Sequence, residues 1–316
     1  MSRLSVGVCR PSVNVLFPIG NEKAFCSIWD SRRKAHLRRK TIIQCCSADF
    51  RVLTSVTSNY NNIVILDTPQ SRVLLLDSSN NVHSILHKGT NWTDAYWDEF
   101  ATLPPIVPKG PLAIFGLGGA TAAHLMLELW PSLLLVGWEI DEILIEKARE
   151  YLGLSDLEKH TQGGGVLEVH IGDVLSSSVT IPGGYAGIIV DLFSDGKVLP
   201  QLQEVTTWLE MNKMLMPNGR LMVNCGAATK ELSNTSEMMQ PDISKRDDPR
   251  ELNTTINALC KAFPEQVGWK KLPKIAGENY LALTGPLPDL DIWSAHLPDQ
   301  LSSSVKEWRS CTPSPS

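Results

Sequence analysis

The sequence predicts an α/β protein in which a mostly parallel sheet carries helices on both faces and follows a small antiparallel β unit. Short apolar runs alternate with helical segments between residues 110 and 225, as repeated β-α-β units do. The run Leu133–Trp138 is apolar throughout, as in a strand buried on both faces. Three shorter strand-like runs lie between Tyr60 and Leu86, and turn residues separate them.

The elements are expected in the following order. The β unit contains the strands Ile63–Leu66, Val73–Leu76 and Val82–Leu86, and a helix at Trp92–Phe100 follows. The strands of the large sheet are Leu112–Phe115, Leu133–Trp138, Val166–Ile171, Tyr185–Val190, Arg220–Asn224, Gln266–Leu272 and Asn279–Thr284. The helices among them are Ala120–Trp130, Ile143–Leu152, Glu204–Leu215 and Glu251–Phe263.

This pattern divides the chain into four parts. Residues 1–48 form a presequence, 49–105 the β unit, 106–290 the large α/β domain and 291–316 a C-terminal tail. Within the large domain, residues 226–250 are polar and are expected to form a flexible insertion. Trp293 and Trp308 indicate that part of the tail docks on the domain.

Charge divides the 316-residue chain unevenly. Hydrophobic residues make up 43% and charged residues 20%, which excludes a disordered or collagen-like chain. The formal net charge is -5, yet residues 1–48 hold nine Lys and Arg against two acids, and the remainder holds 20 against 32. The acidic body argues against nucleic acid as its partner. There is no apolar stretch of about 18 residues, so we expect no membrane span.

The basic presequence has the composition of an organelle transit peptide. The run Ile43-Gln44-Cys45-Cys46-Ser47-Ala48 is similar to a plastid processing site, which predicts the chloroplast stroma as the destination. The alternative interpretation is a basic arm that binds nucleic acid or anionic lipid. A reporter fused to residues 1–50 separates the two, because a diffuse cytosolic signal contradicts targeting.

Cysteine usage gives no sign of a metal or a disulfide framework. Only Cys225, Cys260 and Cys311 lie outside the presequence, and the chain has no CxxC and no His at zinc spacing. We therefore expect no structural metal.

Glycine and acidic residues follow successive predicted strands. Gly116-Leu117-Gly118-Gly119 lies between a strand and a helix, where a tight turn exposes backbone N–H groups to a ligand. Glu139 ends the next strand and can accept hydrogen bonds from ribose hydroxyls. Asp173 ends the third strand, where an adenine amino group can be read, and Asp191 ends the fourth. The carboxyl ends of parallel strands meet at one edge, so these groups predict a nucleoside site.

Structural interpretations compete for several of these residues. The glycine turn is also typical of a plain β-α connection, Asp173 of a helix N-cap and Asp195 of a turn. We expect Asp141, rather than Glu139, to cap the following helix. Thr121 stands where the dinucleotide fingerprint needs a small residue, which favours one nucleoside with an aminoacyl arm over NAD.

These motifs together resemble those of the spermidine/spermine synthase-like family. The matching segments are Ile114–Gly119, Trp138–Asp141, Gly172-Asp173, Val190–Asp195, Ser58–Ile63, Leu76-Asp77, Tyr96–Pro104, Phe263–Glu265 and Asn279–Thr284. The resemblance covers about residues 58–285. It implies the class I S-adenosylmethionine-dependent methyltransferase fold, a Rossmann-like sheet of seven strands, and homodimers, which are common in that family.

The resemblance also implies a set of site residues. The nucleoside pocket would be formed by Gly116, Gly118, Gly119, Glu139, Ile140, Asp173, Val174 and Asp191. Asp191 would be the catalytic base, and Tyr60, Asp98 and Asp195 would contact the acceptor. No metal is implied; the co-substrate would be S-adenosylmethionine or its decarboxylated form.

Departures from the family pattern concern the acceptor. Gly119 stands where the family has an amine-holding acid, Asn61 where it has Gln, and Trp97 where it has His. We therefore expect a methyltransferase-like enzyme with a small-molecule acceptor, such as a polyamine or another amine. The alternatives are an aminopropyltransferase that uses decarboxylated S-adenosylmethionine, and a non-catalytic homologue that acts as an interaction module.

Overall fold

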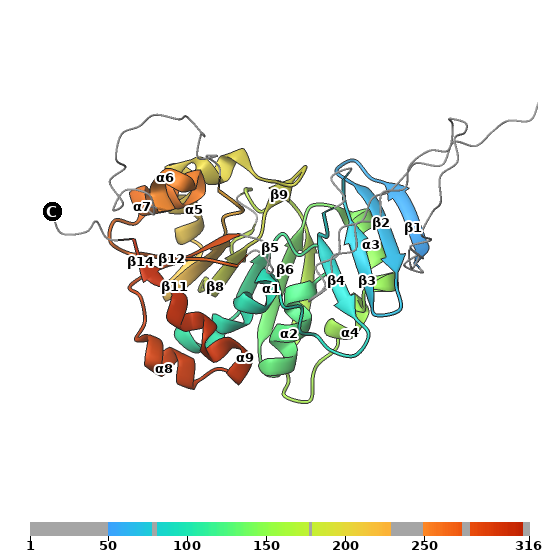
Figure 1. Cartoon of the computed structure of the whole chain (residues 1–316), viewed down its shortest axis with the longest axis horizontal. Helices are drawn as coiled ribbons and strands as arrows, with labels where there is room; N and C mark the ends of the chain where they lie inside the picture. The colour runs from blue at the N-terminus through green and yellow to red at the C-terminus, as the bar shows by residue number, and fades with distance from the viewer. Residues whose placement is uncertain (1–49, 78–80, 177–178, 229–248, 274–278, 312–316) are drawn as a thin grey trace, which may run out of the picture.

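The computed structural model describes residues 50–77, 81–176, 179–228, 249–273 and 279–311. Its two main sheets stand side by side, with the N-terminal sheet at the right of Figure 1. The presequence, its cleavage point and most of the 226–250 insertion lie outside the described residues. None of the described helices is long and apolar enough to cross a bilayer.

The N-terminal sheet is an antiparallel meander of four strands. Its order is β1 (Arg51–Thr57), β2 (Asn62–Asp67), β3 (Ser71–Leu75) and β4 (Ser84–His87). The sequence predicted the last three, whereas β1 has exposed and half-buried residues without a clear alternation. Short helical turns follow at α1 (Tyr96–Glu99), η1 (Phe100–Thr102) and η2 (Pro104–Ile106), in place of one helix over Trp92–Phe100.

The large sheet has eight strands in the order β14-β12-β13-β11-β8-β5-β6-β7. Their bounds are β5 (Leu112–Phe115), β6 (Leu134–Glu139), β7 (Val166–Ile171), β8 (Tyr185–Val190), β11 (Leu215–Asn224), β12 (Val267–Lys271), β13 (Tyr280–Thr284) and β14 (Arg309–Ser310). The strands from β11 to β7 are parallel, and β13 is antiparallel to both of its neighbours. The predicted α/β class is thus confirmed, with one strand more than the seven expected.

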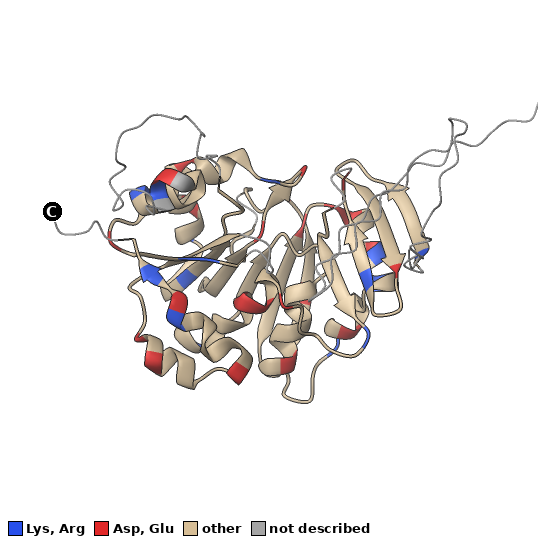
Figure 2. Cartoon of the chain, viewed as in Figure 1, with Lys and Arg blue, Asp and Glu red and all other residues tan. Residues whose placement is uncertain are grey.

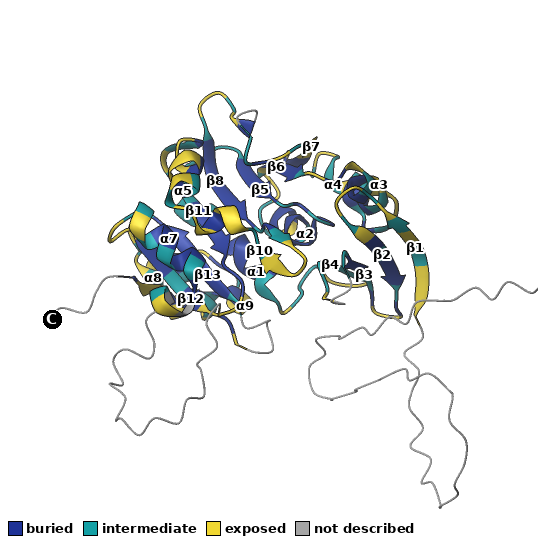
Figure 3. Cartoon of the chain, turned by 90° about the horizontal axis from the view of Figure 1, so that it is seen from above, coloured by how far each residue is buried: buried dark blue, intermediate teal, exposed yellow. Residues whose placement is uncertain are grey.

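Helices cover both faces of this sheet. One face packs against α2 (Thr121–Leu129) and α3 (Glu142–Tyr151), and the other against α5 (Val205–Asn212) and α7 (Thr254–Ala262). Figure 3 shows the central strands buried along most of their length. The predicted helix Glu251–Phe263 is divided into α6 (Pro249–Leu252) and α7, because Asn253 is extended and its side chain caps α7. The remaining short elements are α4 (Leu154–Leu157), β9 (Phe193–Ser194), β10 (Lys197–Val198) and η4 (Pro200–Gln203).

The C-terminal tail docks on the domain, as the two tryptophans indicated. It forms α8 (Leu290–Ala295), α9 (Asp299–Ser302), η7 (Ser304–Glu307) and then β14, the extra strand, which pairs with β12. Trp293 and Trp308 are both buried, and the Trp293 indole N–H donates to the carbonyl of Thr102 at 2.8 Å. The tail therefore contacts the segment that follows α1.

A buried ion pair reinforces this contact. The Lys270 ammonium on β12 lies 2.7 Å from a carboxylate oxygen of Glu99 in α1, and both side chains are almost inaccessible. The Ser304 hydroxyl donates to the other oxygen of Glu99, and the Ser304 carbonyl accepts from Lys270. Burial lowers the pKa of Lys270, while the charge of Glu99 opposes that shift. The Lys270–Glu99–Ser304 cluster thus joins α1, β12 and the tail.

Candidate active site

A cavity of about 690 Å³ lies between the N-terminal sheet and the carboxyl ends of β5, β6, β7 and β8. Among the predicted site residues, those that line it are Tyr60, Gly116, Gly118, Glu139, Ile140, Asp173, Val174 and Asp191. Figure 2 shows acidic residues in the loops between the two sheets. The edge of the parallel sheet therefore brings most of the predicted site together, as strand-end geometry requires.

The glycine turn after β5 needs its glycines. Gly116 has φ +84°, and a Cβ added there would lie 2.3 Å from the carbonyl oxygen of Asp191. Gly118 also has positive φ, and its N–H donates to a carboxylate oxygen of Glu139 at 3.0 Å. Only glycine combines this backbone conformation with so close an approach to a neighbouring strand end.

Glu139 holds the loops at the end of β6. Besides the Gly118 N–H, its carboxylate accepts from the backbone N–H groups of Ile140 and Asp141. Burial raises the pKa of Glu139, and the three N–H donors oppose that shift. Asp141 caps α3 by accepting from the Leu144 N–H, as predicted. The same carboxylate accepts from Ser58 and Asn61, which ties the N-terminal sheet to the site.

Asp173 and Val174 follow β7 at the far side of the cavity. Asp173 is exposed, and its side chain accepts from the Leu175 N–H at 2.9 Å, which closes a turn. The Asp173 side chain thus caps a turn, whereas the capping interpretation from the sequence was a helix N-cap.

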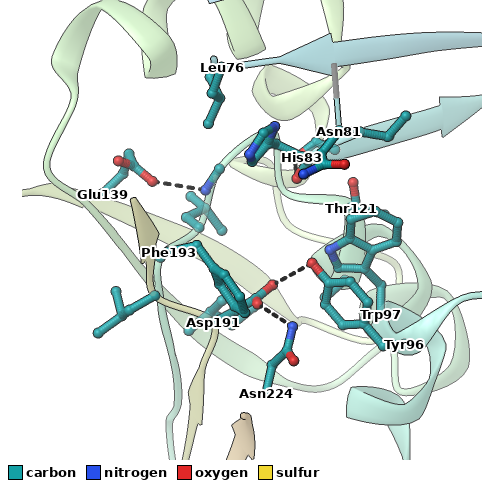
Figure 4. Close-up of a pocket in the computed structure, with 18 of the residues that line it drawn as sticks. Leu76, Asn81, His83, Tyr96, Trp97, Thr121, Glu139, Asp191, Phe193 and Asn224 are labelled. Carbon is teal, nitrogen blue, oxygen red and sulfur yellow. Dashed lines mark hydrogen bonds between the residues drawn. The ribbon is translucent and has the colours of Figure 1, made fainter. Parts of the chain in front are cut away.

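Asp191 lies at the centre of a polar chain (Figure 4). The Tyr96 hydroxyl donates to one carboxylate oxygen at 3.1 Å, and the Asn224 amide donates to the other at 2.9 Å. The Asn224 carbonyl in turn accepts from the Asn279 amide and from the Gly226 N–H. Burial raises the pKa of Asp191 to about 6, although both donors oppose that shift. A carboxylate with this pKa is a stronger base than an ordinary one and is ionised at neutral pH.

Three predicted residues are not brought to the cavity. The Gly119 N–H donates to the Ser84 hydroxyl, and a Cβ at Gly119 would lie 2.5 Å from Leu152. Asp98 is buried, and its carboxylate accepts from Thr93 and Asp94, so it shapes the loop before α1. Asp195 is exposed at the turn between β9 and β10, with φ +50°. Their positions give no support to the predicted roles; for Asp195, the turn interpretation fits.

Sequence reasoning missed Tyr96, Asn224, Asn279 and Phe193 as site residues, although all four line the cavity. Asn224 ends a predicted parallel strand, so a search for any polar strand end, rather than for acids alone, would have found it. Asn279 directly precedes the antiparallel strand β13, at an amino end for which the strand-end rule gives no signal.

His83 also lines the cavity, and its ring lies 3.3 Å from Asp77. Burial lowers the pKa of His83, and the charge of Asp77 opposes this shift. Within the described part of the chain, there is no cluster of three or more His, Cys, Asp or Glu residues suited to a metal ion.

Comparisons with solved structures identify proteins that share this fold. No protein-family model and no curated protein matches the chain. Among solved structures, a spermidine synthase in complex with the transition-state analogue AdoDATO is 17% identical, with a TM-score of 0.55 over 74% of this chain and 73% of that one. A probable spermidine synthase from Corynebacterium glutamicum ATCC 13032 is 16% identical, with a TM-score of 0.52 over 73% and 79%.

The spermidine synthase from Thermotoga maritima gives similar values: 16% identity, a TM-score of 0.52, and coverage of 74% of this chain and 72% of that one. At these identities the likeness establishes the fold. The chain has the fold of the spermidine synthases, as its motifs implied.

Proposed function

We propose that the protein is a transferase that binds an adenosyl sulfonium compound and passes an alkyl group from its sulfur to a nucleophile beside Asp191. One observation carries the proposal: four successive parallel strands bring the glycine turn, Glu139, Asp173 and Asp191 to a single cavity. We call Gly116, Gly118, Glu139 and Asp173 the donor end, and Tyr96, Trp97, Asp191, Phe193 and Asn224 the acceptor end.

The chemistry is an in-line displacement at a carbon bound to a positively charged sulfur. The sulfur leaves as a neutral thioether, so the leaving group needs little acid catalysis. The protein mainly aligns the nucleophile and excludes water. Asp191 accepts the proton that the nucleophile loses, and Tyr96 and Asn224 orient its two oxygens.

S-adenosylmethionine is the donor we favour. The family's amine-holding acid is absent from this loop, because Gly119 stands at that position and has no room for a side chain, so no acid there binds the amine of the decarboxylated compound. Decarboxylated S-adenosylmethionine, and hence aminopropyl transfer, is the second candidate, favoured by the spermidine synthases among the structural neighbours.

Calorimetric titration tests both. We expect S-adenosylmethionine to bind. Glu139→Ala should weaken binding about 10- to 100-fold, because it removes an acceptor for the ribose and the three backbone hydrogen bonds that hold the loops. Glu146→Ala is the matched control, because Glu146 is exposed on α3 and lies outside the cavity lining. Tighter binding of the decarboxylated compound selects aminopropyl transfer. Absence of binding by any adenosyl sulfonium refutes both transferases and leaves the interaction module.

We also propose that the protein acts in the chloroplast stroma, on the composition of residues 1–48. The reporter fusion of residues 1–50 tests this separately from the reaction.

A further inference from the structure

The acceptor end has a single negative charge among its described residues. Within the described lining of the whole cavity, the carboxylates are Glu139, Asp173 and Asp191, and neither Lys nor Arg contributes. The two lining histidines, His83 and His87, have pKa values lowered by burial, which disfavours their charged forms. Charge recognition of an acceptor therefore depends on which of the three carboxylates it reaches.

Glu139 and Asp173 are remote from the acceptor end. Asp191 follows β8, whereas Glu139 ends β6, two positions further along the sheet, and Asp173 follows β7, three positions along. With strands about 4.8 Å apart, Glu139 lies roughly 10 Å to the side of Asp191. Its oxygens already accept three backbone N–H groups.

Asp191 itself can balance the charge of one ammonium group. Each of its oxygens already accepts one hydrogen bond, from Tyr96 or from Asn224, which leaves about one lone pair on each. The Asn224 carbonyl accepts two further hydrogen bonds and is saturated. A second ammonium group at this end would lose its water without gaining a counter-charge from the described residues, which is unfavourable.

The space around Asp191 is aromatic. The Tyr96 and Trp97 rings lie 4.4 Å apart, centroid to centroid, and Trp97 is buried. In Figure 4 the Phe193 ring lies on one side of the Asp191 carboxylate and the Tyr96 and Trp97 rings on the other. Such walls favour a flat apolar body and attract a single cation through their ring faces.

We infer that the acceptor is an arylalkyl monoamine, a nucleophile with one amino group on a flat apolar body, rather than a diamine or polyamine. The inference rests on the proposed function for its chemistry. One bond forms between the amine nitrogen and the transferred carbon, and the bond from that carbon to sulfur breaks. The electron pair stays on the sulfur, and the nitrogen's proton goes to Asp191.

Amine titration of the full-length protein tests this inference. The protein is saturated with S-adenosylhomocysteine, and 2-phenylethylamine, butylamine and 1,4-diaminobutane are compared by calorimetry. We expect 2-phenylethylamine to bind about tenfold more tightly than the diamine, with butylamine between them. Equal or tighter binding of 1,4-diaminobutane, or no binding of any amine, overturns the inference.

Two variants sharpen the result. Phe193→Ala should weaken the binding of 2-phenylethylamine about tenfold and that of butylamine much less. Only 2-phenylethylamine has a ring that loses a stacking partner in this variant. Ser194→Asp adds a second carboxylate at an exposed lining position and should strengthen the diamine several-fold. If Phe193→Ala affects all three amines equally, the aromatic wall does not select the acceptor.

The same titrations without nucleoside separate this inference from the proposed function. Failure of every adenosyl compound to bind, with the amine ranking preserved, refutes the transferase and leaves the monoamine site. Normal nucleoside binding with a preference for the diamine refutes the monoamine site and leaves the transferase.

Discussion

The two ends of the cavity differ in the groups that form them. The donor end uses the main chain: positive-φ glycines and backbone N–H groups gathered around Glu139 at the ends of adjacent strands. The acceptor end uses side chains from three distant segments, represented by Tyr96, Asp191 and Asn224, and Asn279 supports Asn224 from a fourth. The donor end thus depends on local geometry, whereas the acceptor end depends on how distant segments are held together.

The largest effect should come from breaking that long-range support. Lys270→Met leaves the Glu99 carboxylate buried without its counter-ion and should lower the free energy of unfolding by about 3–5 kcal/mol. Amine binding should suffer more than nucleoside binding, because Glu99 belongs to the helix that carries Tyr96. Urea unfolding and calorimetry measure the two effects.

Lys213→Met is the matched control, since its ion pair with Glu210 is exposed and contributes less than about 1 kcal/mol. Adding Glu99→Gln to Lys270→Met should recover part of the lost stability. Equal losses in the two single variants would mean that the buried pair gives no special support to the acceptor end.

The donor end should be most sensitive to substitutions that disturb its backbone conformation. Gly116→Ala forces a Cβ against the Asp191 carbonyl at positive φ, with an expected cost of about 2–5 kcal/mol and loss of nucleoside binding. Gly164→Ala shares the φ of +84° but meets nothing within 4 Å, so it should cost only about 1–2 kcal/mol. Thermal unfolding compares the two. A similar cost for both would show that the close approach is relaxed easily.

A third prediction concerns the pH dependence of stability. The pKa of Asp191 is raised to about 6 in the folded protein against 3.8 ordinarily, so the native state keeps this proton to higher pH than the unfolded state does. The contribution of Asp191 to the free energy of unfolding is therefore at its maximum below about pH 4. It declines by about 2–3 kcal/mol as the pH rises through 6.

Asp191→Asn should remove that decline. The stability difference between wild type and variant should fall between pH 4 and pH 6.5 and be constant above pH 7. Asp98, whose pKa is also raised to about 6 by burial, titrates in both proteins and cancels from the difference. A pH-independent difference would place the Asp191 pKa near its ordinary value.

The smallest effect is expected for Tyr96→Phe. It removes one donor to Asp191, about 0.5–1.5 kcal/mol, and should weaken amine binding several-fold at neutral pH. Because the Tyr96 hydroxyl lowers the pKa of Asp191, the pH midpoint of amine binding should move upward. Tyr151→Phe serves as the control, because Tyr151 lies on α3 outside the cavity lining, and we expect it to leave the midpoint in place. An unchanged midpoint in Tyr96→Phe would show that the hydroxyl does not stabilise the charged carboxylate.

The same contrast explains what sequence reasoning could foresee. The positions of Gly116 and Glu139 followed from strand ends, and the Asp141 cap followed from its place before a helix. Asp98 lies outside the cavity lining because the direction of its carboxylate depends on Thr93 and the loop before α1. Gly119 lies outside it because contacts with Leu152 and Ser84, distant in sequence, close that position. Tertiary packing decided these cases, and no local pattern reports it.

The Lys270–Glu99–Ser304 cluster also has a consequence for protein synthesis. Residues 96–99 leave the ribosome long before Lys270 and Ser304 are translated. Until then the Glu99 carboxylate has no buried partner, and the nascent chain favours keeping it in water. We therefore expect the helix that carries Tyr96 to dock in its final position only after β12 and the tail have been synthesised, and thus after the donor-end strands β5 to β8.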